Sequence, residues 1–550
     1  MVCCYKISRF LFILLIPLLF NTCIKEDFDP DKLDTEIIIK PGVAAPLGYI
    51  HYELEEILKD SLHPEGMVVD NDGFIRMVYE EEIFSFQASE FLQFSDIQHS
   101  GSINNDLPVP LNLSLIQDPF IQTDTINFSL TGTEGPDYTE IDSIITDSLT
   151  IVVTLSSSYN LDGILQISSP RIIKNGAAWS ATIPLSSNVQ SFNLQGYTIV
   201  LSNNPPDVNL IPIIFTMTLE RSQGTVPAGS PVMSYQLSVN NISYSVIYGY
   251  LGIMNITIDP QTFPVSFFNS IIDGTFHFEE PELKLYFENS FGLPIQVIMT
   301  DFYAISREGN QLAITGDSVP SPSYPRIIRY PSISEVGLTA YDSLILNPDN
   351  TNLFEALESS PGSISFGVET ETNPSGNINE NFITDNSQYS VKAKLILPLH
   401  GYADFMLMVD TISFNFEDFF QNPPEEIKRL AFRLNFTNGL PVNVYAQMYF
   451  TDENYAVLDS IFDSPHLVEA AADQDGDGKV DPIQNDPVEV EFIRTKIDNI
   501  STSRYILLYG NLTTTNYDMV PPENVKFYTD YFIDAYIGVT GDIELNSTGN

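Results

Sequence analysis

The chain has 550 residues, of which 43% are hydrophobic and 17% charged, a composition typical of folded domains rather than of disorder. At a soft prior of about 150 residues per domain, it is long enough for three or four domains. Only 24 Lys and Arg oppose 72 Asp and Glu, and the formal net charge of -48 excludes nucleic acid and anionic lipid headgroups as partners and favours cations.

The first 22 residues are laid out as a secretory signal. Lys6 and Arg9 precede an apolar run of 11 residues, 10–20, which as a helix would span about 16 Å and is too short to cross a membrane. Residues 1–22, followed by Cys23, resemble a bacterial lipoprotein signal peptide. The resemblance implies cleavage before Cys23 and lipidation of its sulfur and amine. The mature chain would then keep one cysteine, which excludes disulfides.

Residues 23–38 read as an acidic tether. Lys25, Glu26 and Asp27 resemble the export signal of Bacteroidota-type surface lipoproteins, which implies a lipid-anchored protein on the outer face of the outer membrane. A solvated tether without an export role is the alternative. The segment 40–49 resembles the start of a group of large, uncharacterised Bacteroidota lipoproteins, and this resemblance implies no activity.

The rest of the chain is predicted to be mainly β. Short β-branched or alternating segments, such as 149–155, 392–397 and 488–493, are separated by Gly, Pro, Asn and Asp. Apolar spacing predicts helices only at 49–59 and 353–357. We therefore expect tandem β-sandwich-like units with few short helices.

Two internal echoes support tandem units. Residues 283–297 and 432–444 share an alternating strand, an Asn turn and a second strand begun by Leu-Pro, with seven of 13 aligned positions identical. Residues 162–172 echo 273–283 more loosely. The first pattern resembles the water-stress-type β-sandwich; turn chemistry common to all β proteins is the alternative. We expect an N-terminal mixed β unit at 39–150, a β unit at 151–262, and sandwich-like units at 263–424 and 425–550.

The segment 473–481 carries the sharpest local motif. Asp473, Asp475, Asp477 and Asp481 occupy positions 1, 3, 5 and 9 with Gly478 at position 6, and this resembles an EF-hand or dockerin calcium loop. Lys479 would contribute its carbonyl oxygen. Gln484 stands where such loops carry a bidentate Glu, so we predict a helix-poor structural calcium site. A solvated Asp-Gly hairpin is the alternative.

A second pattern is dispersed along the chain. Asp followed by Ser or Thr and an apolar residue occurs more often than the roughly three times that this composition would give by chance. The triplet resembles the O-glycosylation sequon of secreted Bacteroidota proteins, although Asp-Ser turns entering strands would also produce it. The candidate acceptors are Ser61, Thr125, Ser143, Ser148, Ser318, Ser343, Thr411 and Ser460.

Enzyme signatures are missing from the sequence. The six His are at least 12 residues apart, and no nucleophile elbow, phosphate loop or dinucleotide fingerprint occurs. The carboxylate pairs at 55–56, 279–280 and 425–426 are expected on the solvated surface. Tyr244, Val246, Tyr248 and Tyr250 would share one face of an extended strand, as a core stripe or a sugar-stacking platform.

These observations predict a non-enzymatic outer-membrane surface lipoprotein that acts as a binding or scaffold subunit. Its partner would be an outer-membrane protein complex for nutrient uptake or barrel assembly, and calcium is the one cofactor expected. A glycan-binding surface lipoprotein is the first alternative. A carbohydrate-active hydrolase is the second, and it requires two carboxylates that meet in a cleft.

Overall fold

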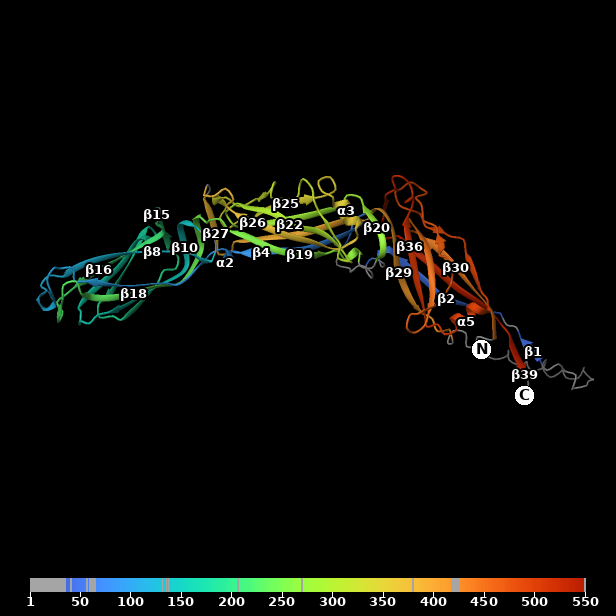
Figure 1. Cartoon of the computed structure of the whole chain (residues 1–550), viewed down its shortest axis with the longest axis horizontal. Helices are drawn as coiled ribbons and strands as arrows, with labels where there is room; N and C mark the ends of the chain where they lie inside the picture. The colour runs from blue at the N-terminus through green and yellow to red at the C-terminus, as the bar shows by residue number, and fades with distance from the viewer. Residues whose placement is uncertain are drawn as a thin grey trace, which may run out of the picture.

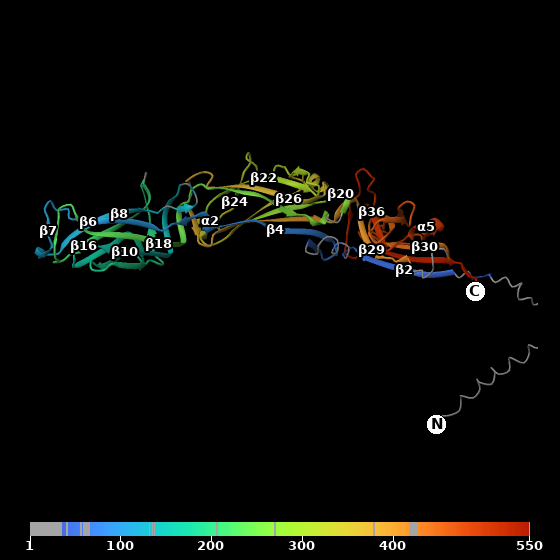
Figure 2. The same ribbon diagram turned by 60° about the horizontal axis from the view of Figure 1, so that its bottom comes forward.

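The computed structural model describes residues 36–39, 42–55, 58, 66–130, 132–134, 136, 138–204, 207–268, 271–377, 380–416 and 426–548. The expected signal, Cys23, the export residues Lys25, Glu26 and Asp27, and Ser61 lie outside these residues. The prediction of a mainly β fold is confirmed, because strands make up most of the described chain. The strands form three lobes in a row, which we call proximal, middle and distal (Figures 1 and 2).

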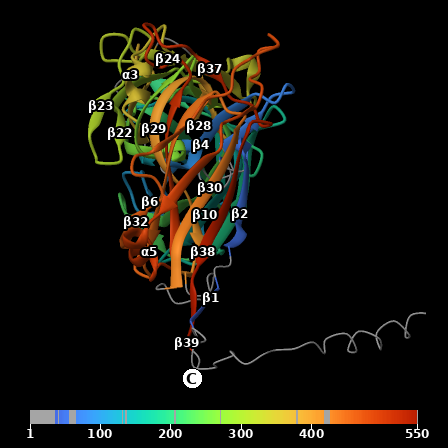
Figure 3. The ribbon, with the colours of Figure 1, turned by 90° about the vertical axis from the view of Figure 1, so that its right-hand side faces the viewer.

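The proximal lobe contains the first and last described strands. β1 (Glu36–Ile39) and β39 (Leu545–Thr548) pair as a two-stranded ribbon at the base of the rod (Figure 3). One sheet has the order β2 (Gly42–Glu53), β38 (Phe532–Ile543), β30 (Ile427–Asn438), with β34 (Ile483–Gln484) and β35 (Val488–Phe492) beside β30. The second sheet has the order β20 (Ile271–Phe278), β29 (His400–Ser413), β36 (Tyr505–Thr514), β31 (Val442–Thr451), β32 (Val457–Ser460), with β33 (His466–Val468) and β37 (Val525–Lys526) alongside.

The middle lobe is a sandwich of two five-stranded sheets. The first has the order β25 (Ala340–Leu346), β21 (Glu282–Asn289), β28 (Gln388–Pro398), β4 (Ile75–Gln87), β3 (Met67–Val69). The second has the order β19 (Asn255–Pro264), β26 (Pro361–Thr372), β22 (Ile295–Ser306), with β23 (Gln311–Ala313) and β24 (Arg326–Ile328) paired to β22. Helix α3 (Leu353–Glu358) forms where 353–357 was predicted to be helical.

The distal lobe is built on one 11-stranded sheet. Its strands are β6 (Ile97–Asn104), β8 (Phe120–Ser129), β10 (Glu140–Ser156), β11 (Gly163–Lys174), β12 (Ala177–Pro184), β13 (Val189–Asn193), β14 (Thr198–Val200), β15 (Ser202–Asn204), β16 (Asp207–Leu219), β18 (Pro231–Tyr250) and β27 (Asn381–Thr384). Because β14 pairs with both β10 and β11, it joins two halves of the sheet. The halves pack face to face: Tyr235 of β18 stacks on Phe215 of β16 at 4.3 Å between ring centroids.

The predicted helix at 49–59 is wrong over 49–53, because those residues belong to β2 and pair with β38. Residues 49–53 also alternate as in a strand, since Ile50 and Tyr52 are less exposed than Tyr49, His51 and Glu53. Pairing with a strand almost 490 residues away overrides the local helical spacing.

The lobes are nested rather than arranged in chain order. The chain lays β1 and β2 in the proximal lobe and β3 and β4 in the middle lobe, and then forms most of the distal lobe. It returns to complete the middle and proximal lobes and adds β27 to the distal sheet (Figure 1). The expected boundary at 150 falls inside β10, and both the middle and proximal lobes combine segments from before and after the distal lobe. The structural units therefore differ from the linear units expected from composition.

The three lobes share a frame of six strands. Three strands of one sheet, or of one half of the distal sheet, run β10-β18-β6, β4-β28-β21 and β2-β38-β30 in the distal, middle and proximal lobes. Three of the other run β11-β16-β8, β19-β26-β22 and β29-β36-β31. The first sequence echo is this repeat, since β21–β22 and β30–β31 occupy equivalent places. The second echo, between 162–172 and 273–283, does not reflect this repeat, because β11 is a central strand and β20 is an edge strand.

A buried Asn marks the repeated turn in every lobe. Asn289 and Asn438 are fully buried, and each side-chain oxygen accepts a hydrogen bond from the backbone N–H two residues ahead at 2.9 Å. Asn105 is also fully buried and accepts from the N–H of Leu107 at 3.2 Å. Asn105-Asp-Leu-Pro-Val is thus a third copy of the motif, which the sequence comparison missed because no Leu-x-Phe strand precedes it.

Candidate functional site

The acidic loop 473–481 lies between β33 and β34 in the proximal lobe. The Asp473 carboxylate accepts hydrogen bonds from the N–H groups of Gly476 at 2.6 Å and Gly478 at 2.9 Å. Both glycines have positive φ, 83° and 91°, which an L side chain rarely adopts. Asp481 accepts from the N–H of Gln474 at 2.8 Å and closes the loop. The Asp and Gly residues therefore close this segment into a compact loop, as the motif predicted.

The loop brings three of its four predicted carboxylate ligands together. Oxygens of Asp473, Asp475 and Asp481 all lie within 4.8 Å of one another, which suits a hard cation with oxygen ligands. Asp477 is outside this triad, and its carboxylate accepts from the N–H of Lys479 at 2.8 Å. The Lys479 ammonium points away, to Asp530 at 3.0 Å. Gln484, at position 12, is in strand β34.

A cleft of about 830 Å³ opens where the middle and proximal lobes meet. Five chain segments form its walls, and they include the places where the chain passes between the lobes. The lining residues are Asp70, Asp72, Phe74, Arg76, Glu279, Glu280, Pro281, Glu282, Asn347, Pro348, Asp349, Phe354, Ile396, Pro398, His400, Lys526 and Tyr528. Sequence reasoning missed this site because its carboxylates come from separate segments and obey no periodicity.

Backbone hydrogen bonds hold the junction behind the cleft together. Leu399 N–H donates to the carbonyl of Ile75 at 3.0 Å, and Phe527 N–H donates to the carbonyl of Leu399 at 3.0 Å. Ile75 N–H in turn reaches the carbonyl of Phe527 at 3.2 Å. These bonds tie segments of both lobes together behind the cleft.

The cleft carries an excess of negative charge. Six carboxylates line it against Arg76 and Lys526. Burial, and the nearby Lys526, lower the pKa of His400, so this side chain is neutral at neutral pH. The pair Glu279 and Glu280, expected on the solvated surface, lies here; Glu280 is exposed and Glu279 is half-buried.

The tyrosines proposed as a common face are separated by the structure. Tyr244 is buried, with 9% of its surface exposed, whereas Tyr248 and Tyr250 are half-buried. Register shifts between β10 and β18 on either side of Tyr244 change which residues face inward, so the expected single face is wrong. A bulge cannot be seen in an alternating pattern of this length.

A different pair of tyrosines is exposed on the proximal lobe. Tyr49 of β2 and Tyr536 of β38 stack at 4.4 Å between centroids, with 53% and 47% of their surfaces exposed. Asp534 accepts a hydrogen bond from the Tyr49 hydroxyl at 3.0 Å and lies 2.6 Å from His51 Nδ1. This bond to Asp534 raises the pKa of His51. Sequence reasoning missed the group because it placed 49–59 in a helix.

The candidate glycosylation residues lie mostly on strands. Thr125 on β8 and Ser343 on β25 are exposed, whereas Ser143, Ser148, Ser318 and Ser460 are half-buried. Thr411 is in β29. The hydroxyls of Ser148 and Ser460 already donate to the backbone carbonyls of Asn241 and Phe462, both at 2.8 Å.

Three of these Asp-Ser or Asp-Thr pairs share one geometry. Asp124, Asp342 and Asp459 each accept a hydrogen bond from the N–H of the next residue, at 2.9, 2.8 and 2.8 Å. All three lie on edge strands, β8, β25 and β32. The carboxylate occupies an N–H that an edge strand leaves unpaired and adds a charge there, which opposes pairing with another chain. Edge protection therefore accounts for part of the recurring triplet without glycosylation.

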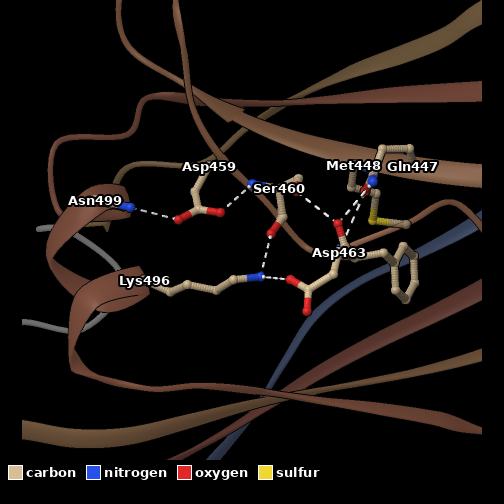
Figure 4. A network of polar contacts seen from close by, with 8 residues as sticks. Gln447, Met448, Asp459, Ser460, Asp463, Lys496 and Asn499 are labelled. Carbon is tan, nitrogen blue, oxygen red and sulfur yellow. Dashed lines mark hydrogen bonds and ion pairs between the residues drawn. The ribbon is translucent and has the colours of Figure 1, made fainter.

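The pair on β32, Asp459 and Ser460, belongs to a wider polar network (Figure 4). Helix α5 (Arg494–Ile500) donates from Asn499 to Asp459 at 2.8 Å, and its Lys496 pairs with Asp463 at 2.7 Å. Gln447 of β31 donates to the carbonyl of Phe462 at 3.0 Å. These bonds fasten the edge strand to its helix and to the sheet behind it, so this network has a structural role.

The comparisons with known proteins assign the chain to no family. No protein-family model and no curated protein matches the chain. Among solved structures, it is similar to a Parabacteroides distasonis protein whose description suggests that it is secreted, with 10% identity and a TM-score of 0.29 over 91% of this chain and 99% of that one. It is also similar to the VP2 protein of infectious bursal disease virus, with 8% identity and a TM-score of 0.12 over 90% and 84% of the chains. No helix in the described ranges is both long and apolar enough to span a bilayer.

Proposed function

We propose that the chain is a lipid-anchored surface protein of the outer membrane that acts as a non-enzymatic binding or scaffold subunit. The arrangement of the three lobes in a row supports this proposal. β1 and β39 lie together at its base, and the distal lobe lies at the opposite end (Figures 1 and 2). Only 12 residues separate Cys23 from β1, a reach of about 40 Å when fully extended. A lipid on Cys23 would hold the base near the membrane and project the distal lobe outward.

The anchor is tested by replacing the lipidated sulfur. In cells that export the protein, Cys23→Ala is expected to move it from the membrane fraction to the soluble fraction and to abolish incorporation of a labelled fatty acid. Cys3→Ala and Cys4→Ala are matched controls, since both residues precede the cleavage site, and they should leave the protein in the membrane. A Cys23→Ala protein that fractionates like the wild type would overturn the proposal.

We further propose that the acidic loop binds calcium in a structural role. The triad Asp473, Asp475 and Asp481 supplies three oxygen ligands, and backbone carbonyls and water would complete the coordination. The surrounding net negative charge raises the local concentration of any cation.

A glycan-binding role is the second candidate, and the exposed pair Tyr49 and Tyr536 favours it. Tyrosine faces stack on sugar rings, and Asp534 and His51 beside them can form hydrogen bonds with sugar hydroxyls. A glycan array probed with the wild type and with a Tyr49→Ala, Tyr536→Ala double variant tests this role. Loss of one specific glycan signal in the variant would support it, and an array without signal would count against it.

A further inference from the structure

The cleft between the middle and proximal lobes has four carboxylates without a cationic partner among the described residues. Asp70 pairs with Arg76 at 2.8 Å, and Glu282 pairs with Lys284 at 2.7 Å. Asp72, Glu279, Glu280 and Asp349 form no ion pair with another described residue, and Glu279 accepts a hydrogen bond from Asn524 at 2.7 Å. Such a wall focuses negative potential into the cleft and attracts a positively charged ligand.

Two aromatic rings at the cleft already bind cations of this chain. Phe74 and Tyr528 meet edge to face at 6.0 Å between centroids. The Arg76 guanidinium lies 5.6 Å from the Phe74 centroid, and the Lys479 ammonium lies 4.5 Å from the Tyr528 centroid. The ring faces are thus occupied by cations of this chain, and the unpaired carboxylates are the groups left to hold the ammonium or guanidinium groups of a ligand.

The same rings argue against a sugar as the occupant. Phe74 and Tyr528 expose only 9% and 7% of their surfaces, so neither offers a free face for a sugar ring to stack upon. The volume of about 830 Å³ is instead within the range of pockets that enclose ligands of several hundred daltons. An extended segment of several residues, with basic side chains directed at separate carboxylates, fits this form and charge.

We propose that this cleft binds a Lys- or Arg-rich extended peptide segment of a partner protein. The inference rests on the proposed binding role and names the chemistry of the partner. It does not depend on the lipid anchor, because the binding experiment takes place in solution without membranes. Failure of the anchor test and failure of this test are therefore distinguishable.

The probe is a fluorescein-labelled hexa-arginine peptide, titrated with the purified mature chain and followed by fluorescence anisotropy. The test variant Asp72→Asn, Glu280→Gln, Asp349→Asn removes the three exposed carboxylates among these four, and Asn at 72 keeps an acceptor for the Phe74 N–H. We expect its affinity to fall about tenfold at low salt, with a melting temperature like that of the wild type. Lys526→Gln removes an opposing charge from the cleft, so it should raise the affinity.

The matched control removes the same number of exposed carboxylates elsewhere, with Asp118→Asn, Asp259→Asn and Glu453→Gln. It should bind within about twofold of the wild type. Equal losses in both triple variants would show attraction to overall charge alone and would overturn the proposal, as would undetectable binding by the wild type. Spermine that displaces the peptide at a lower concentration than unlabelled hexa-arginine would overturn the peptide assignment in favour of a polyamine.

Discussion

At the scale of single residues, buried Asn side chains determine where each sandwich turns. Asn438 accepts from the Leu440 N–H and donates to the carbonyls of Val442 and Glu469, each at 2.9 Å. Asn438→Ala would leave these groups buried without partners, so the proximal lobe should lose about 1–3 kcal/mol of unfolding free energy. Hydrogen exchange at the Leu440 amide measures this loss locally. Asn435→Ala, on the same strand and half-buried, should have little effect; equal protection in both variants would contradict the role.

The acidic loop offers a matched pair of carboxylates. Asp475 and Asp477 each accept one backbone N–H, but only Asp475 belongs to the triad. In calorimetric titration with calcium, Asp475→Asn should weaken binding about tenfold or more, because one charged ligand is lost. Asp477→Asn should bind nearly as the wild type does. A wild-type chain that releases no heat with calcium, or a stronger effect at Asp477, would contradict the site.

Glycosylation, where it occurs, should follow exposure. Thr125 and Ser343 are exposed on edge strands, whereas the Ser148 and Ser460 hydroxyls are occupied by hydrogen bonds to backbone carbonyls. Peptide mass spectrometry of the protein from a host that glycosylates such sequons should find sugar at Thr125 and Ser343. Modification at Ser460 instead would contradict this ordering, since its hydroxyl would have to give up the hydrogen bond to the Phe462 carbonyl.

At the scale of elements, the sequence predicted strands and the Asn turns well, because alternation and turn residues are local properties. It did not predict that β2 pairs with β38 or that β4 pairs with β28, since a strand carries no mark of a distant partner. The sequence did not predict the cleft for the same reason, because five segments that lie far apart in the sequence form it. The loop 473–481 was predictable because its ligands lie within nine residues.

The nested topology makes the distal lobe the unit that should fold alone. Every strand of its sheet except β27 comes from the continuous stretch 97–250. We expect residues 95–251, expressed by themselves, to give a β-rich circular dichroism spectrum and a cooperative thermal transition. Residues 425–550 should not fold alone, because β2 and β29, the neighbours of β38 and β36, are missing from them. Cooperative melting of the second fragment but not of the first would contradict the nesting.

At the scale of the whole molecule, the rod separates an attached base from an outlying tip. β7 (Leu111–Asn112) pairs with β17 (Thr225–Val226) at the distal end, and Leu115, with 74% of its surface exposed, follows three residues later. Leu113 in the same segment is fully buried. If Cys23 is acylated, the mature chain has no free thiol. A single introduced cysteine is then the one position that a thiol reagent can label.

The most direct measurement is therefore labelling of intact cells with a membrane-impermeant maleimide. We predict that Leu115→Cys is labelled without lysis, while the wild type and the matched Leu113→Cys variant are not. Labelling of Leu115→Cys only after the outer membrane is broken would contradict the central claim, because the distal lobe would then face the periplasm.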